Sequence, residues 1–180
     1  MTKLRIYDDQ KPEAPIQQTS KSAEIAAILK TIGVRFEQWK TRYLPKGATN
    51  EEIMKAYEIE VAKLVEENGY QSIDVARITP DSPNKEAARS KFFNEHTHTE
   101  DEVRLFVEGS GLFYLHVENK IYIVLCEAGD LISIPPNYKH WFDMSKDPHF
   151  TAIRFFLGPD GWVPEFTQSG LSCRFPEYVK

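Results

Sequence analysis

Apolar and polar positions change their period near residue 80 of this chain. Before that point apolar side chains recur at helical spacing, and after it they alternate as in β-strands. The first helix is predicted to begin near Ser20 or Ser22 and to end at Gly33. Its apolar positions, at spacings of three, four and seven residues, are Ile25, Ile28, Leu29 and Ile32.

A second helix is predicted from a capping box, in which Thr49 is followed three residues later by Glu52. The helix should end at Asn68 and Gly69, because glycine tolerates the left-handed conformation that closes many helices. Its apolar stripe is Ile53, Tyr57, Leu64 and Val65.

Two strands and a third helix complete the first half of the chain. The segments GVRFEQW (33–39) and YQSIDVARIT (70–79) are typical of short strands. Good helix formers follow Pro83, which suits the first turn of a helix over residues 83–93.

From Val103 onward, six short segments of period two are separated by Gly, Asn, Asp or Pro. They cover residues 103–109, 111–119, 120–129, 130–136, 140–144 and 151–157. This pattern indicates a mainly β fold with added helices, in which an antiparallel barrel or sandwich has the N-terminal helical region packed outside it. A small barrel of this kind has an interior for side chains or one small ligand.

Length and composition favour one domain over residues 1–180. Its regions are a helical part with short strands (1–90), a β-rich core (91–163) and a C-terminal tail (164–180). The chain has 22 basic and 27 acidic residues, a net charge of −5 and no basic block, so nucleic acid is not an expected partner. The modest charge is compatible with a monomer.

The apolar runs are too short for a membrane. The longest, Ile121 to Cys126, is far below the roughly 20 residues of a membrane helix, and the first ten residues lack the apolar stretch of a signal peptide. Cys126 and Cys173 suit a reducing compartment better than a disulfide scaffold. We therefore expect a cytoplasmic protein without membrane contact.

Three histidines and one glutamate form the richest chemical pattern in the sequence: His96, His98, Glu102 and His140. If residues 96–98 are extended, the first two imidazoles leave the same face about 7 Å apart. A straight strand would carry Glu102 about 13 Å beyond His98, so a turn is required within TEDE (99–102).

These four ligands would leave two positions of an octahedral metal ion open. Structural zinc prefers a closed tetrahedral site, whereas imidazole and carboxylate with open positions favour Fe(II) and also admit nickel or manganese. One Fe(II) or Ni(II) per chain is the expected cofactor. The remaining histidines, His116 and His149, have no acidic partner at ligand spacing and are not assigned to the site.

Two arginines stand near this pattern. Arg104 has the same strand parity as Glu102, so it could bind an anionic substrate or form a salt bridge to the ligand carboxylate, and the residues alone leave both open. Arg154 lies in the apolar segment TAIRFF. The aromatic candidates for a pocket, which are equally candidates for the core, are Phe92, Phe142 and Trp162.

The spacing His96-x-His98-x3-Glu102-x6-Gly109, with Gly129-x5-Pro135-x4-His140, resembles the two cupin motifs. The strings KFFNEHTHTEDEVRLFVEGSGLF, DLISIPPNYKHWFDM and FTAIRFF are similar to the acireductone dioxygenase family in particular, and GVRFEQW and GYQSIDV extend that similarity over about residues 33–163. The sequence departs from the general cupin pattern at Ser90, Asn137 and Met144, none of which is a ligand.

The resemblance implies a small double-sheet, jelly-roll-like barrel and a reaction. The family cleaves 1,2-dihydroxy-3-keto-5-methylthiopentene with O2 in methionine salvage. Iron(II) gives formate and 4-methylthio-2-oxobutanoate, and nickel(II) gives formate, carbon monoxide and 3-methylthiopropanoate. An enediolate could occupy both open metal positions.

The resemblance also implies roles for the other candidates. Arg104 would stabilise the substrate dianion and Arg154 would hold a second substrate oxygen. Phe92, Phe142 and Trp162 would form the pocket for the methylthio group. Two other functions remain open: another cupin activity at the same open metal, and a binding or regulatory module in which the metal only stabilises the barrel.

Overall fold

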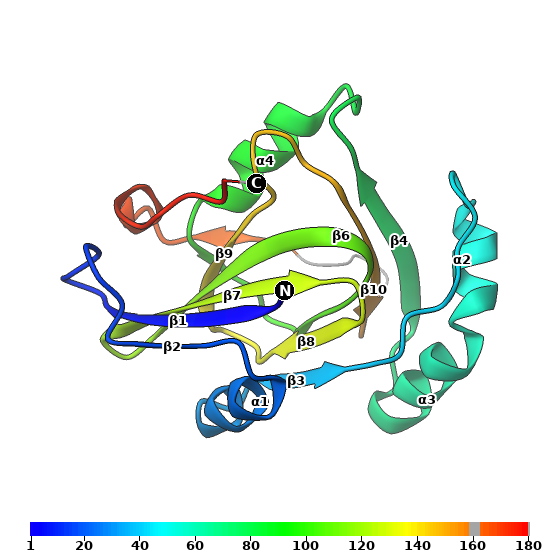
Figure 1. Ribbon diagram of the computed structural model, residues 1–180, viewed down its shortest axis with the longest axis horizontal. Helices are drawn as coiled ribbons and strands as arrows, with labels where there is room; N and C mark the ends of the chain where they lie inside the picture. Colours follow the sequence, from blue (N-terminus) through cyan, green and yellow to red (C-terminus); the bar gives the residue numbers. More distant parts are fainter. Residues whose placement is uncertain (159–162, 180) are drawn as a thin grey trace.

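Antiparallel strands dominate the computed structural model, which describes residues 1–158 and 163–179 (Figure 1). The strands are β1 (Lys3–Asp8), β2 (Gln17–Thr19), β3 (Arg35–Gln38), β4 (Ser72–Ile78), β5 (His96–Thr97), β6 (Glu102–Val117), β7 (Lys120–Glu127), β8 (Asp130–Ile134), β9 (Lys139–Asp143), β10 (Phe150–Phe156) and β11 (Glu165–Phe166). The helices are α1 (Ser22–Thr31), α2 (Asn50–Ala56), α3 (Glu58–Asn68), α4 (Lys85–Phe93) and the 3-10 helix η1 (Leu171–Arg174).

The second predicted helix is two helices. The predicted capping box at its start is confirmed, because the Thr49 hydroxyl accepts from the Glu52 backbone N–H and the Glu52 carboxylate accepts from the Thr49 N–H. The break falls at Tyr57, whose φ of −109° and ψ of 18° separate α2 from α3. Tyr57 is fully buried, and its hydroxyl accepts from the Arg42 backbone N–H, so packing overrides the continuous apolar stripe. The predicted end is confirmed at Gly69, with φ 74°.

One long strand, β6, connects two sheets. Residues 102–109 of β6 pair with β10 and β8, and residues 110–117 pair with β7 and β9. The smaller sheet contains β4, β10, β6, β8 and β3, and the larger sheet runs β11-β5-β9-β6-β7-β1-β2. The two segments predicted as separate strands here are therefore one strand that changes sheet at Gly109, where φ is 69°.

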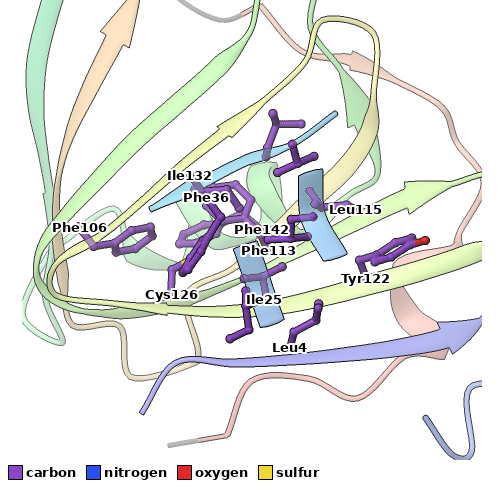
Figure 2. Close-up of a cluster of buried hydrophobic side chains, with 14 of the residues drawn as sticks. Leu4, Ile25, Phe36, Phe106, Phe113, Leu115, Tyr122, Cys126, Ile132 and Phe142 are labelled. Atoms are coloured by element: carbon purple, nitrogen blue, oxygen red, sulfur yellow. The ribbon is translucent and has the colours of Figure 1, made fainter. Parts of the chain in front are cut away.

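Apolar side chains from both sheets meet in one inner core (Figure 2). Phe106 and Ile132 come from the smaller sheet, and Phe113 and Phe142 come from the larger one. The rings of Phe113 and Phe142 lie 4.8 Å apart between their centroids. Since Glu102 and Arg104 share the strand parity of Phe106, and His140 shares that of Phe142, these polar residues belong to the same interior.

A different part of the chain packs on each outer face of the sandwich. Helices α2 and α3 lie on the smaller sheet beside β4 (Figure 1), where Ile53 and Leu64 join its outward side chains in a buried cluster. The C-terminal segment covers the larger sheet, where Leu171 and Phe175 pack with Trp141. Helix α1 differs from α2 and α3, because it contributes Ile25 and Leu29 to the inner core.

The mainly β fold with added helices is confirmed, but the predicted barrel is not closed. Among the described residues, the pairing path of the larger sheet ends at β11 on one side and β2 on the other. These end strands have only two and three residues, and side chains of α1 contribute to the inner core. None of the helices in the described part of the chain combines the length and apolar character needed to span a membrane.

Candidate metal centre

The four predicted ligands converge at one end of the sandwich interior. The ligand atoms of His96, His98, Glu102 and His140 all lie within 4.8 Å of one another, and all four residues are buried. His96 in β5 pairs directly with His140 in β9. The predicted turn is present as a bend at residues 99–100, and it returns the chain so that Glu102 can start β6.

Backbone carbonyls fix the orientation of all three imidazoles. The Nδ1 atoms of His96, His98 and His140 lie 2.6, 3.0 and 2.8 Å from the carbonyl oxygens of Asn94, Val163 and Tyr138, respectively. A carbonyl oxygen only accepts, so each Nδ1 donates and each Nε2 offers a lone pair. This is the arrangement by which proteins prepare histidines as metal ligands.

The Glu102 carboxylate completes the cluster. Its Oε2 lies 3.0 Å from His98 Nε2 and 3.1 Å from His140 Nε2. Lone pairs of imidazole and carboxylate repel unless a proton or a cation lies between them. Three imidazole nitrogens and one carboxylate oxygen suit a divalent first-row metal, so the donor set fits such an ion.

The electrostatic environment keeps His96 and Glu102 in the protonation states that bind a cation. Burial, and after it the neighbouring His140, lower the pKa of His96 to about 4, which leaves the His96 imidazole neutral at pH 7. Burial alone would raise the pKa of Glu102, but the charge of the Arg104 guanidinium, with the neighbouring imidazoles of His140 and His98, holds it well below its ordinary value. Glu102 is therefore a carboxylate in a water-poor interior.

Arg104 is the buried cation beside the ligands. Its Nη2 lies 2.7 Å from Glu102 Oε1, and its side chain is 3% exposed. The guanidinium carbon lies 4.6 Å from the ring centre of Phe142, 5.2 Å from that of Phe113 and 5.7 Å from that of Phe92. Of the two roles left open by the sequence, the structure contains the salt bridge to the ligand carboxylate.

Arg154 lies opposite Arg104 in the β6–β10 pair. Its guanidinium binds the Asp74 carboxylate of β4 through two contacts, with Nε 2.8 Å from Oδ1 and Nη2 2.5 Å from Oδ2. Directly paired residues present their side chains on the same face. The structure thus brings Arg154 near Arg104 and shows an acidic partner that the sequence analysis missed.

The aromatic candidates occupy different environments. Phe142 is buried in the inner core, and Phe92 is half-buried on α4, where it packs against that core. A Cβ at Gly111 would come within 2.2 Å of Phe142 Cζ, so this ring is tightly enclosed. Trp162 lies outside the described residues.

Two polar groups that the sequence analysis did not assign to a site have partners in the fold. His116, which was set aside, has its Nδ1 2.8 Å from Glu95 Oε2. Asp143 is fully buried and accepts from Nε and Nη2 of Arg89 as well as from the Tyr178 backbone N–H. Strand alternation was the available signal for the position of Glu95, because a residue next to His96 in an extended segment must face the opposite side.

A cupin-type β fold with a buried three-histidine, one-carboxylate cluster defines the class as a mononuclear metal protein. The model of the ARD/ARD′ family matches residues 3–164. The chain belongs to the ARD/ARD′ family.

Relatives along the full chain agree with this assignment. The chain is 52% identical over 180 residues to acireductone dioxygenase of Stenotrophomonas maltophilia (strain K279a), covering 99% of this chain and 97% of that protein. It is 49% identical over 178 residues to acireductone dioxygenase of Hahella chejuensis (strain KCTC 2396), covering 99% and 96%.

A solved structure is also similar. Acireductone dioxygenase from Bacillus anthracis, described with a cadmium ion in its active center, matches with a TM-score of 0.79 and 30% identity. The match covers 92% of this chain and 98% of that chain.

Proposed function

We propose that this chain is a metal-dependent acireductone dioxygenase of methionine salvage. Its substrates are 1,2-dihydroxy-3-keto-5-methylthiopentene and O2. With iron(II) the products are formate and 4-methylthio-2-oxobutanoate, and with nickel(II) they are formate, carbon monoxide and 3-methylthiopropanoate. The observation that carries the proposal is the buried ligand cluster with Arg104 against its carboxylate.

His96, His98, Glu102 and His140 would hold one Fe(II) or Ni(II) per chain. A bound ion of this kind supplies Lewis-acid and template chemistry for a substrate that offers two oxygens. The protein's own part is to present three Nε2 lone pairs and one carboxylate oxygen in a buried site, with each imidazole fixed by a backbone carbonyl.

Arg104 supplies the positive charge for an anionic substrate. Its guanidinium lies among aromatic rings with little water, so its charge acts in a medium of low dielectric constant. A buried cation favours the deprotonated form of a bound enediol. The charges of Glu102 and Arg104 nearly cancel, so a divalent ion held by the four ligands would balance the added negative charge of the substrate.

The remaining candidates would position the substrate. Arg154, on the same face as Arg104, is proposed to hold a second substrate oxygen while Asp74 orients its guanidinium. Phe92, Phe142 and Trp162 are proposed to line the apolar pocket for the methylthio group. The Phe142 ring is the best supported of the three, since it lies 4.6 Å from the Arg104 guanidinium.

Product analysis tests this function. Metal-free protein is reconstituted with Fe(II) or with Ni(II) and exposed to acireductone and O2, beside metal-free protein and free ions. We expect formate and the keto acid from the iron form, and carbon monoxide from the nickel form. If both forms hold one metal per chain and neither exceeds its controls, the metal centre stands and the substrate assignment is wrong.

Assembly state and cellular location are also part of the proposal. Residues 1–180 are proposed to act as one domain, because Tyr7 near the N-terminus packs with Leu171 and Phe175 of the C-terminal segment in one buried cluster. A monomer is proposed from the modest net charge. Two free cysteines, buried Cys126 and exposed Cys173, favour the reducing cytoplasm. Sedimentation of the purified chain tests the monomer, and fractionation of cells tests the location.

A further inference from the structure

A polar network lies on the far side of the strand that carries His96. The Glu95 side chain is only 2% exposed, and its Oε2 accepts from His116 Nδ1 at 2.8 Å. Its Oε1 accepts from the Thr167 hydroxyl at 2.6 Å. The other nitrogen of His116 lies 3.4 Å from Asp9 Oδ2. Three distant segments therefore meet at one buried carboxylate.

Glu95 and His96 are adjacent and face opposite sides of the backbone. His96 points into the ligand cluster, while Glu95 points to His116 at the far end of β6. The carbonyl that orients His96 is that of Asn94, and the peptide unit containing it ends at the nitrogen of Glu95. A rotation of Glu95 would therefore turn the hydrogen-bond acceptor of the ligand imidazole.

The backbone ladder alone holds this segment weakly. Strand β5 has two residues, and β11, which pairs with it through Phe166 opposite His96, has two as well. The Glu95 carbonyl adds one bond, from the Thr167 N–H at 3.0 Å. Because so few ladder bonds fix the segment, a charged hydrogen bond to a residue of the long strand β6 makes a large contribution to its geometry.

We infer that Glu95 and His116 are a positioning pair that fixes the His96 imidazole for metal binding. The inference rests on the metal centre of the proposed function, and it goes beyond the four ligands. His116 is not one of the four ligands, and its side chain contacts Glu95 and Asp9. It acts on the metal through Glu95 and the peptide unit between Asn94 and Glu95.

The test measures metal binding rather than turnover. Affinity for Ni(II) is measured by competition with a chelator, and the Co(II)-loaded protein gives an absorption spectrum that reports ligand geometry. The variants are Glu95→Gln, His116→Asn and the double variant. His149→Asn is the matched control, because His149 is exposed and lies 3.8 Å from another glutamate, Glu108, away from the ligands.

We expect each single variant to bind Ni(II) about 10–100-fold more weakly, the range for residues that hold a metal ligand in place. The double variant should be no weaker than the weaker single variant, since the two residues act as one pair. The Co(II) bands should shift in all three variants and stay unchanged in His149→Asn. A loss of global packing alone would not move the bands of the folded protein.

Three outcomes would overturn the inference. Wild-type protein that binds no Ni(II) removes the proposed metal function and this inference with it. Wild-type binding with unchanged affinity and spectrum in His116→Asn removes the inference alone. If His116→Asn does not fold, Thr167→Val is measured instead. Thr167 is half-buried, and this substitution removes the other side-chain hydrogen bond to Glu95. An unchanged Co(II) spectrum in Thr167→Val would then remove the inference.

Discussion

Arg104 and Glu102 stand two residues apart on β6, and the Arg104 Nη2 lies 2.7 Å from the Glu102 Oε1. Both side chains are buried, at 3% and 2% exposure. The second carboxylate oxygen, Oε2, faces the Nε2 atoms of His98 and His140. One carboxylate thus joins the buried Arg104 cation, which is proposed to bind substrate, to the histidines of the ligand cluster. Removal of either partner of this ion pair leaves an uncompensated charge in the interior.

The first prediction concerns this shared carboxylate. Glu102→Gln keeps the shape of the side chain but removes the charge of a ligand. Substitution of a residue that only orients a ligand costs about 10–100-fold in metal affinity, so we expect Ni(II) affinity to fall more than about 100-fold here. The metal-free variant should also lose about 3–5 kcal/mol of unfolding free energy, because Arg104 remains buried without its counter-charge. Metal competition and urea unfolding measure the two effects.

Glu108→Gln is the matched control, because Glu108 lies on the same strand with half of its side chain exposed. It should change stability by less than about 1 kcal/mol and leave Ni(II) affinity unaltered. Equal Ni(II) affinity in Glu102→Gln and wild type would contradict the assignment of Glu102 as a ligand.

The second prediction separates the acireductone reaction from another cupin activity. Arg104→Met replaces the guanidinium with an apolar chain of similar length. If the reaction needs an anionic enediolate, kcat/KM should fall at least about 100-fold, or about 2.7 kcal/mol of transition-state stabilisation. Steady-state kinetics of the metal-loaded variant measure this, and a rate near that of wild type would favour a different reaction.

The third prediction compares Arg154 with Arg104. Arg154 is bound to Asp74, whose side chain is 46% exposed, so this pair lies closer to solvent than the Arg104–Glu102 pair. Arg154→Met should therefore mainly raise KM, by about tenfold or less, and cost less than about 1 kcal/mol of stability. A larger loss of kcat in Arg154→Met than in Arg104→Met would reverse the roles proposed for the two arginines.

Local spacing was enough to predict the ligand cluster. His96, His98 and Glu102 lie within seven residues, and the turn they need follows from strand geometry. His140 could be added because it stands at the start of a strand-like segment, and its pairing with His96 is a consequence of the sheet.

Contacts across long sequence separations could not be predicted in this way. Arg154 binds Asp74 from 80 residues away, and His98 is oriented by a carbonyl 65 residues away. The N-terminal segment Lys3–Asp8 was not assigned to a strand, yet it pairs with β7 along its whole length. The alternation of apolar residues indicates a buried face but not the partner that buries it.

The fourth prediction concerns the point at which β6 changes sheet. Gly109 has φ 69°, and a Cβ there would lie 1.9 Å from the His149 carbonyl oxygen. Gly109→Ala combines left-handed strain with a clash against backbone, so we expect about 2–4 kcal/mol of lost unfolding free energy. Gly47→Ala, with φ 78° and no atom within 4 Å of the added Cβ, is the control for strain alone and should lose about 1 kcal/mol. Urea unfolding of both variants isolates the clash, and equal losses would exclude it.

The Glu95–His116 pair should give the chain a defined pH window of stability. Burial alone would raise the pKa of Glu95, but hydrogen bonds from His116, Thr167 and Ser169 lower it from 4.5 to about 2. A lowered carboxyl pKa adds stability that is present above about 4.5 and is lost as the pH falls toward 2. The hydrogen bond to Glu95 raises the pKa of His116 above 6.5, so the same interaction is complete below 6.5 and is lost as the pH rises through the folded value.

The fifth prediction follows from these two pH limits. Both pKa shifts arise from the same Glu95–His116 interaction, so its free energy is counted once. At 1.36 kcal/mol per pKa unit, the Glu95 shift corresponds to about 3 kcal/mol. The difference in unfolding free energy between wild type and Glu95→Gln should therefore be largest between about pH 4.5 and 6.5 and decrease on both sides. Urea unfolding from pH 2 to 9 with a chelator present measures it without the pH dependence of metal binding. His149→Asn should show no such maximum, and a difference between wild type and Glu95→Gln that stays constant with pH would mean that the buried pair is not ionised.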